Sequence, residues 1–169
     1  MRGMAAAEDH LDHIVGQWRR ERPDLNVAPL ASMGRLLRAA DLADAAFADG
    51  LAGYGLGPGW FDLMAALRRA GSPYELNPTQ LMRETMISSG GMTKRLDRLT
   101  EAGLVRRRPD PDDRRGTLVQ LTPRGVALID AALETHIANE DRVLSSLNAS
   151  ERRSLDALLR KLLEGLERA

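Results

Sequence analysis

Apolar residues recur three and four positions apart along most of this chain, which is the spacing of a helix with one buried face. Three such helices are predicted in the first half of the sequence, over residues 6–20, 29–49 and 58–70. Pro23 ends the first helix, and a run of glycines between residues 50 and 59 separates the second helix from the third. Pro58 suits the first turn of the third helix, and Gly71 closes it.

Two further helices, joined by a short turn, are predicted next. Asn77 and Pro78 suit the N-cap and the first position of one helix. The other helix begins at Ser88 or Ser89 and ends at Gly103, because glycine readily adopts the left-handed conformation that closes a helix.

A β-hairpin follows, with strands predicted over residues 104–108 and 117–121 and a turn rich in Pro, Asp and Arg. Residues 74–76 are expected to add a short third strand beside it. Helix, turn, helix and then a hairpin with arginines at its tip is the order of a winged helix-turn-helix, which reads DNA. The pattern therefore predicts a mainly α fold with a small β wing.

Two long helices end the chain. Thr122 and Pro123 predict the start of one helix, which runs to about Ser146, and Ser150 is expected to cap the other. A chain of this size cannot easily bury its first helix and its last two against one small winged domain. We therefore expect these helices to form a two-fold homodimer, with a helical layer inside a single chain as the alternative.

The predicted organisation has three parts. An N-terminal arm and dimerisation helices occupy residues 1–50, the winged helix-turn-helix occupies residues 51–122, and C-terminal dimerisation helices occupy residues 123–169. A two-fold dimer also matches a palindromic site on double-stranded DNA, because each half-site then meets one winged domain.

Composition narrows the function classes. Hydrophobic residues make up 43% of the chain and aromatic residues 4%, so the core must be mostly Leu, Ala, Val and Met, which suits packed helices. The absence of cysteine excludes disulfides, thiolate metal sites and thiol redox sensing. The three histidines form no metalloprotease motif, and there is no phosphate loop or nucleophile elbow, which disfavours an enzyme, a metal site or a cofactor. No apolar run has the length of a membrane span, so we expect a soluble cytoplasmic protein without membrane contact.

The charge of the chain is neutral overall but uneven. There are 24 basic and 24 acidic residues, and this balance is weak evidence against a nucleic-acid ligand. Residues 81–115, however, hold nine basic and six acidic residues, a local charge of +3. Basic residues therefore gather on the segment that is predicted to read DNA.

The second helix of the central pair has one apolar side, formed by Met92, Leu96 and Leu99, which must face the core. Its small, polar first turn suits the major groove, and an arginine at the wing tip suits the minor groove. The predicted DNA-binding residues are Ser88, Ser89, Gly90, Thr93, Lys94, Arg98, Arg114 and Arg115. Arg115 is the expected minor-groove residue, held by Asp113. The alternatives are an ordinary solvated helix face and a polar turn that binds nothing.

The segment SSGGMTKRLDRLTEAGLVRRRPDPDDRRGTLVQLTPRG, with the order of helices around it, resembles the MarR family of bacterial transcription regulators. The resemblance covers nearly the whole chain from Asp9 onward, and the wing pattern of Asp113 and Arg115 followed by Leu121 and Thr122 is typical of it. It implies an obligate homodimer with a triangular, all-helical dimerisation region. It also implies repression of adjacent genes that a small anionic ligand relieves.

A narrower resemblance concerns the N-terminal arm. Trp18, followed by the residues ERPDL, is similar to the urate-responsive branch of the family, which carries an extra N-terminal helix. That resemblance implies a ligand site at Trp18, Asp62, Arg95 and Arg107. A phenolic or aromatic acid is an alternative ligand, because a tryptophan and arginines suit either.

The residues themselves support part of this site. Arg95 lies roughly 60–70° from the centre of the apolar side of its helix, so it is expected to turn inward and form a deep pair with Asp62. A planar anion stacked on Trp18 would attract Arg95 and repel Asp62, which would shift the DNA-reading helix.

Each ligand residue also has a structural alternative. Trp18 suits a core or dimer interface, Asp62 suits the positive end of a helix dipole, and Arg95 and Arg107 suit phosphate contacts. A helical protein-interaction adaptor is the alternative from a different class of function.

Overall fold

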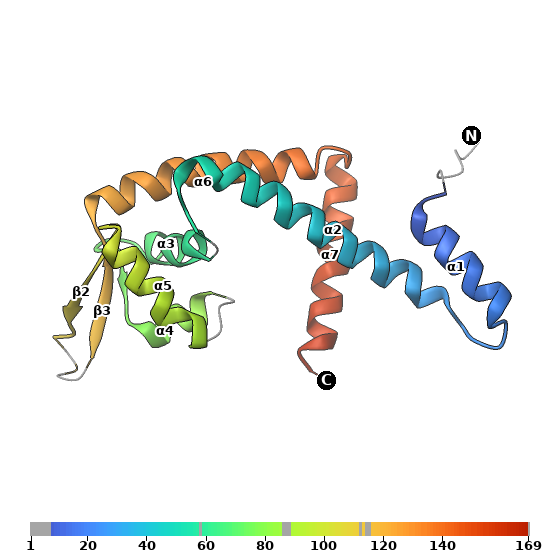
Figure 1. The fold of residues 1–169 in the computed structure, drawn as a ribbon, viewed down its shortest axis with the longest axis horizontal. Helices are drawn as coiled ribbons and strands as arrows, with labels where there is room; N and C mark the ends of the chain where they lie inside the picture. The colour runs from blue at the N-terminus through green and yellow to red at the C-terminus, as the bar shows by residue number, and fades with distance from the viewer. Residues whose placement is uncertain (1–7, 58, 86–88, 112, 114–115, 169) are drawn as a thin grey trace. The chain divides into compact units, whose positions relative to one another are not determined.

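The computed structural model describes residues 8–57, 59–85, 89–111, 113 and 116–168 (Figure 1). The chain divides into two compact units, one up to Ala46 and one from Phe47 onward.

The first unit consists of α1 (His10–Glu21) and most of α2 (Ala28–Leu51). The predicted start of α1 at residue 6 is wrong, because Asp9 has an extended backbone and is the N-cap. Its carboxylate accepts hydrogen bonds from the backbone N–H groups of Leu11 and Asp12 at 2.8 and 3.0 Å. The Asp12 carboxylate accepts the N–H of Asp9 in return, which completes a capping box.

Two contacts join α1 to α2. The Arg35 guanidinium binds the carboxylates of both Asp9 and Asp12 at 2.7 Å. Leu11 packs over Gly34, where a Cβ would come within 2.4 Å of Leu11 Cδ1, so glycine permits the close approach of the two helices. The hydrogen bond from Arg35, with the N–H of Asp12, lowers the pKa of Asp9 to about 2.

The second unit contains the predicted winged helix-turn-helix and the last two helices. Its elements are α3 (Trp60–Arg69), β1 (Glu75–Leu76), α4 (Pro78–Glu84), α5 (Ser89–Glu101), β2 (Val105–Pro109), β3 (Thr117–Leu121), α6 (Pro123–Val143) and α7 (Ala149–Leu166), after a short 3₁₀ turn at Ala52–Tyr54. The three strands form an antiparallel sheet in the order β1-β3-β2. The mainly helical fold with a small β wing is therefore confirmed.

Local cap chemistry accounts for most element ends. Asn77 accepts the N–H of Gln80 at 2.9 Å at the start of α4, and Gly103 has a φ of 67° after α5, both as predicted. The predicted cap of α7 at Ser150 is wrong, because Asn148 accepts the N–H groups of Ser150 and Glu151. The predicted start of α3 at residue 58 is wrong as well, since Gly59 is left-handed and is the N-cap; Pro58 lies outside the described residues.

The core of this unit lies between the helices and the inner face of the sheet. Its largest fully buried side chains are Leu63, Met64, Leu67, Leu81, Leu99, Val119 and Ile129. The predicted inward side of α5 is confirmed, because Met92, Leu96 and Leu99 are all buried. On α3, Phe61 and Ala65 lie partly buried at the edge of this core.

Apolar side chains remain uncovered on two long helices, each taken by itself. Those on α2 include Leu30, Met33, Leu37 and Leu42, and those on α7 include Leu158, Leu162, Leu163 and Leu166. Rows of exposed leucines on one side of a helix mark an interaction surface. Across the described parts of the chain, none of the helices has the length and apolar character needed to cross a membrane.

Candidate nucleic-acid interface and ligand site

The outer side of α5 carries the first group of predicted DNA-binding residues. Thr93, Lys94 and Arg98 are exposed. Lys94 forms no ion pair with any residue that the structure describes, whereas Arg98 lies 3.3 Å from Glu101 one turn later. The Lys94 ammonium is thus available to an external anion.

Several predicted DNA-binding residues lie at or beyond the edge of the described chain. Ser89 and Gly90 belong to the first turn of α5, but their surroundings are outside the described set. Ser88, Arg114 and Arg115 lie outside the described residues, so their roles stay predictions.

The wing hairpin is closed near its tip by backbone hydrogen bonds. The N–H of Asp110 donates to the carbonyl of Gly116 at 3.1 Å, and the N–H of Gly116 donates to the carbonyl of Asp113 at 2.8 Å. A Cβ at position 116 would come within 2.9 Å of the Asp110 Cβ and 3.0 Å of the Asp113 Cβ. A side chain at position 116 would therefore force the hairpin to shift where the returning strand leaves the tip.

The outer face of the sheet is held by two of three consecutive arginines. Arg106 donates to the Gln120 side chain at 2.9 Å. Arg108 donates from Nε to Glu75 at 2.8 Å and from Nη2 to the other carboxylate oxygen. The Arg108 guanidinium lowers the pKa of the Glu75 carboxyl, against a smaller opposing effect of burial. These contacts tie β2 across β3 to β1.

Arg107, the arginine between them, instead contacts α5, the helix that is predicted to read DNA. Its Nη2 donates to Asp97 Oδ1 at 2.7 Å. Asp97 was not among the predicted site residues. Its spacing of ten residues from Arg107 gives no signal in the sequence, because the contact depends on how β2 packs against α5.

The predicted ligand residues fall in both units. Trp18 belongs to α1 of the first unit, where 48% of the residue is exposed. Asp62 lies in the first turn of α3 and is exposed, so the expectation of a deep Asp62–Arg95 pair is wrong about the depth of Asp62. The reason is the packing of α3, which directs the neighbouring Leu63 and Met64 into the core.

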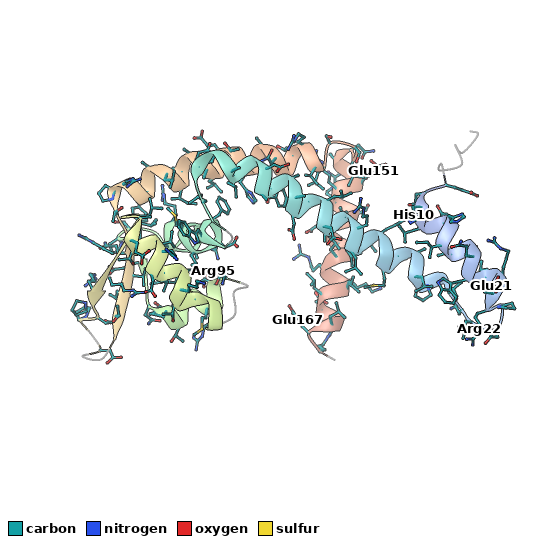
Figure 2. The ribbon with its side chains drawn as sticks, viewed as in Figure 1. His10, Glu21, Arg22, Arg95, Glu151 and Glu167 are labelled. Atoms are coloured by element: carbon teal, nitrogen blue, oxygen red, sulfur yellow. The ribbon has the colours of Figure 1, made fainter. Side chains whose placement is uncertain are left out.

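Arg95 is half-buried on α5, where Figure 2 labels it. Its guanidinium lies over Gly91, because a Cβ at position 91 would come within 2.0 Å of Arg95 Nη1. Arg95 thus lies along its own helix, over Gly91, and Arg107 contacts the same helix at Asp97.

A cluster around His136 on α6 was not among the predicted sites. The His136 ring packs against Phe47 and Phe61, with ring centroids 4.9 and 4.5 Å apart. His136 Nδ1 and Asn139 Nδ2 are buried and have no hydrogen-bond partner among the described residues. A lone histidine beside an apolar helix stripe is the sequence feature that marks this place. Within the described ranges, no group of three acidic, histidine or cysteine side chains is placed to hold a metal ion.

A capped helix, a turn, a second helix with a polar outer side and a three-stranded wing together define a winged helix-turn-helix DNA-binding protein. A family model described as "MarR family" matches residues 54–116. The transcriptional regulator PecS of Dickeya dadantii is 44% identical over 146 residues, which cover 86% of this chain and 88% of PecS. The chain belongs to the MarR family of transcriptional regulators.

Solved structures agree with this assignment. A mutant of MarR from E. coli complexed with operator DNA has a TM-score of 0.70 at 26% identity, covering 86% of this chain and 97% of that one. BpsR of Bordetella bronchiseptica has a TM-score of 0.69 at 30% identity, covering 76% of this chain and 91% of that one. The DNA binding of BpsR is regulated by 6-hydroxynicotinic acid.

Proposed function

We propose that this regulator is a homodimeric repressor that a small anionic aromatic ligand, such as urate, releases from a palindromic operator. The observation that carries the proposal is the placement of Arg95 and Arg107. Arg95 is part of the helix that is predicted to read DNA, and Arg107 forms an ion pair with Asp97 of the same helix. A ligand that binds these arginines therefore acts directly on that helix.

The exposed polar side of α5 supports the DNA-binding part. Lys94 projects from it as an exposed cation, and Thr93 lies beside it as a small polar group. The wing supplies a second contact site through its tip, where Arg114 and Arg115 remain predicted. Operator binding by a structural neighbour of similar fold supports the same assignment.

The uncovered apolar sides of α2 and α7 support a homodimer. Leu37 and Leu163 are more than half exposed on a single chain. Burial of these side chains against a second copy would lower the free energy, because apolar surface leaves water. A two-fold dimer places two copies of α5 one helical turn of DNA apart, which is what two half-sites require.

Arginine chemistry supports an anionic, planar ligand. A guanidinium binds a carboxylate or urate-like anion through paired N–H donors. The exposed Trp18 indole is the predicted stacking surface, and Asp62 the predicted acid that an anion repels. An aromatic acid is the second candidate, favoured by the 6-hydroxynicotinic acid named for BpsR.

The test is release of a fluorescent operator duplex, selected from a random library with the native protein, by urate and by 6-hydroxynicotinate. The parent is compared with Trp18→Phe, Asp62→Ala and Arg95→Ala, and with Arg153→Ala on α7 as the matched control. We expect the three site variants to need more ligand for release, and Arg153→Ala to match the parent. Equal release in all five proteins would contradict the ligand site. Absence of salt-dependent duplex binding would favour the protein-interaction adaptor instead.

A further inference from the structure

The side chains of β2 alternate between the two faces of the sheet. Val105 and Arg107 point to the same face, since they are two residues apart, and Arg107 lies opposite Val119 in the register. Val105 and Val119 are buried, so this is the face that covers the core. Arg107 is therefore the one arginine of β2 on the core face, where the strand packs against α5.

At the edge of the core face, Arg107 forms a polar contact with Asp97 of α5. Its Nη2 lies 2.7 Å from Asp97 Oδ1, and the side chains are 39% and 48% exposed. Asp97 belongs to the third turn of α5, well beyond the first turn that is predicted to enter the major groove. The ion pair thus links the wing to the recognition helix from the side of the helix.

We propose that Asp97 is a positioning residue, which holds the wing against the recognition helix through Arg107, and that an anion capturing Arg107 releases the wing. The second part rests on the proposed function, because it takes Arg107 as a ligand residue. The pair fixes the relative placement of the two elements that must meet one DNA duplex together. Its loss leaves each element intact but makes their simultaneous contact with the operator less favourable.

The exposure of the pair explains why an anion can displace Asp97. Half-exposed ion pairs are weak, because water and salt screen them. Asp97 engages one of the five N–H donors of the guanidinium, so a planar anion can bind through two others.

The neighbouring Arg108 is held more firmly than Arg107. Arg108 uses two nitrogens on Glu75, whose side chain is only 14% exposed. Arg108 therefore anchors the sheet, while Arg107 is the exchangeable contact.

Charge alone predicts the opposite effect of removing Asp97. Loss of an acidic group beside DNA strengthens binding to any duplex. A positioning role predicts instead that Asp97→Asn weakens binding to the operator relative to an unrelated duplex. The ratio of the two affinities therefore separates positioning from electrostatics.

The absence of native cysteine allows a direct measurement. Pro111→Cys places a spin label on an exposed residue near the wing tip, and its mobility is recorded in the free protein. We expect Asp97→Asn to increase label mobility and to reduce the operator preference about threefold to tenfold. Asp156→Asn is the matched control, because it breaks an exposed ion pair with Arg160 inside α7. The exchanged pair, Asp97→Arg with Arg107→Asp, should restore low mobility.

Adding urate should raise label mobility in the parent and produce no further rise in Asp97→Asn. Equal mobility and equal operator preference in Asp97→Asn and Asp156→Asn would overturn the positioning role. Operator release by urate with unchanged label mobility would overturn release through Arg107. Failure of the proposed function itself looks different, because the parent would then show no operator binding or no response of the operator complex to urate.

Discussion

Arg95 lies over Gly91, one turn earlier on the same helix, so closely that a Cβ at position 91 would come within 2.0 Å of Arg95 Nη1. Glycine at this position makes room for the guanidinium above the first turns of α5. The turn that is predicted to enter the major groove and the arginine that is predicted to sense the ligand therefore occupy one patch of the helix.

Gly91→Ala is expected to displace Arg95 without unfolding the helix. The obstacle to the new methyl group is the far end of a flexible side chain, and alanine favours a helix over glycine by about 1 kcal/mol. We expect unchanged or slightly higher thermal stability. We also expect a roughly tenfold higher urate concentration for half-release of the operator, which corresponds to a loss of about 1.4 kcal/mol in the free energy of ligand binding.

A double-mutant comparison isolates the role of Arg95 in that effect. In an Arg95→Ala background there is no guanidinium to displace, so Gly91→Ala should leave the urate response unchanged. If Gly91→Ala weakened the urate response of the Arg95→Ala variant as much as that of the parent, position 91 would act independently of Arg95.

Gly125→Ala should destabilise the fold, although a Cβ at position 125 overlaps its nearest atom as closely as a Cβ at position 91 does. A Cβ at position 125 would come within 2.0 Å of the Leu104 carbonyl oxygen, which is backbone and already accepts the N–H of Thr122 at 3.0 Å. We expect a loss of about 1–3 kcal/mol in the free energy of unfolding, measured with urea, because overpacking forces the backbone to move. A change within about 0.5 kcal/mol of the parent would contradict this.

Local chemistry made much of the fold predictable. Asn77 with Pro78 starts a helix, and Gly103 ends one, through interactions within a few residues. The cap at Asn148 was missed because Ser150 is also a good cap residue. The sequence did hold the deciding signal, since Glu151 stands three residues after Asn148 and completes a capping box.

Contacts between elements were the part that the sequence could not supply. Helical spacing gives the direction of Asp97 from the axis of α5, but the arrival of Arg107 from β2 depends on the packing of the sheet. The same holds for Asp62, whose exposure depends on which side of α3 the core covers. The contact of Arg107 with Asp97 thus had to come from the structure.

The contact of α1 with α2 should weaken in acid. The pKa of Asp9 is lowered from 3.8 to about 2, mainly by Arg35, so the carboxylate stabilises the contact above pH 3.8 and loses this effect as the pH falls through 2. The fluorescence of Trp18 on α1, in a Trp60→Phe background, should report this transition.

Asp9→Asn is the sharper variant for the acid transition, because asparagine also caps a helix but carries no charge. It should reduce the transition between pH 4 and 2, leaving the smaller part that comes from Asp12, whose pKa Arg35 also lowers. Identical pH profiles for the parent and Asp9→Asn would show that the ion pair with Arg35 does not contribute.

A charge placed among the exposed leucines of α7 should prevent dimer formation. Leu163 is 55% exposed on the single chain, and an interface that covers it would have to bury an unpaired carboxylate in Leu163→Glu. We expect the variant to sediment as a monomer at micromolar concentration and Arg153→Glu, on the same helix, to sediment as a dimer. A dimer in both variants would place the interface elsewhere.

Lys94→Gln should weaken DNA binding in a way that salt reveals. Each phosphate contact releases counterions, so removing one lysine contact makes the slope of log affinity against log salt shallower by about 1 per protomer. Lys94 has no ion partner among the described residues, whereas Arg98 is shared with Glu101, so Arg98→Gln should change the slope less. Lys161→Gln on α7 serves as the control for net charge. If Lys94→Gln and Lys161→Gln gave the same slope, the outer side of α5 would not be the surface that meets the phosphates.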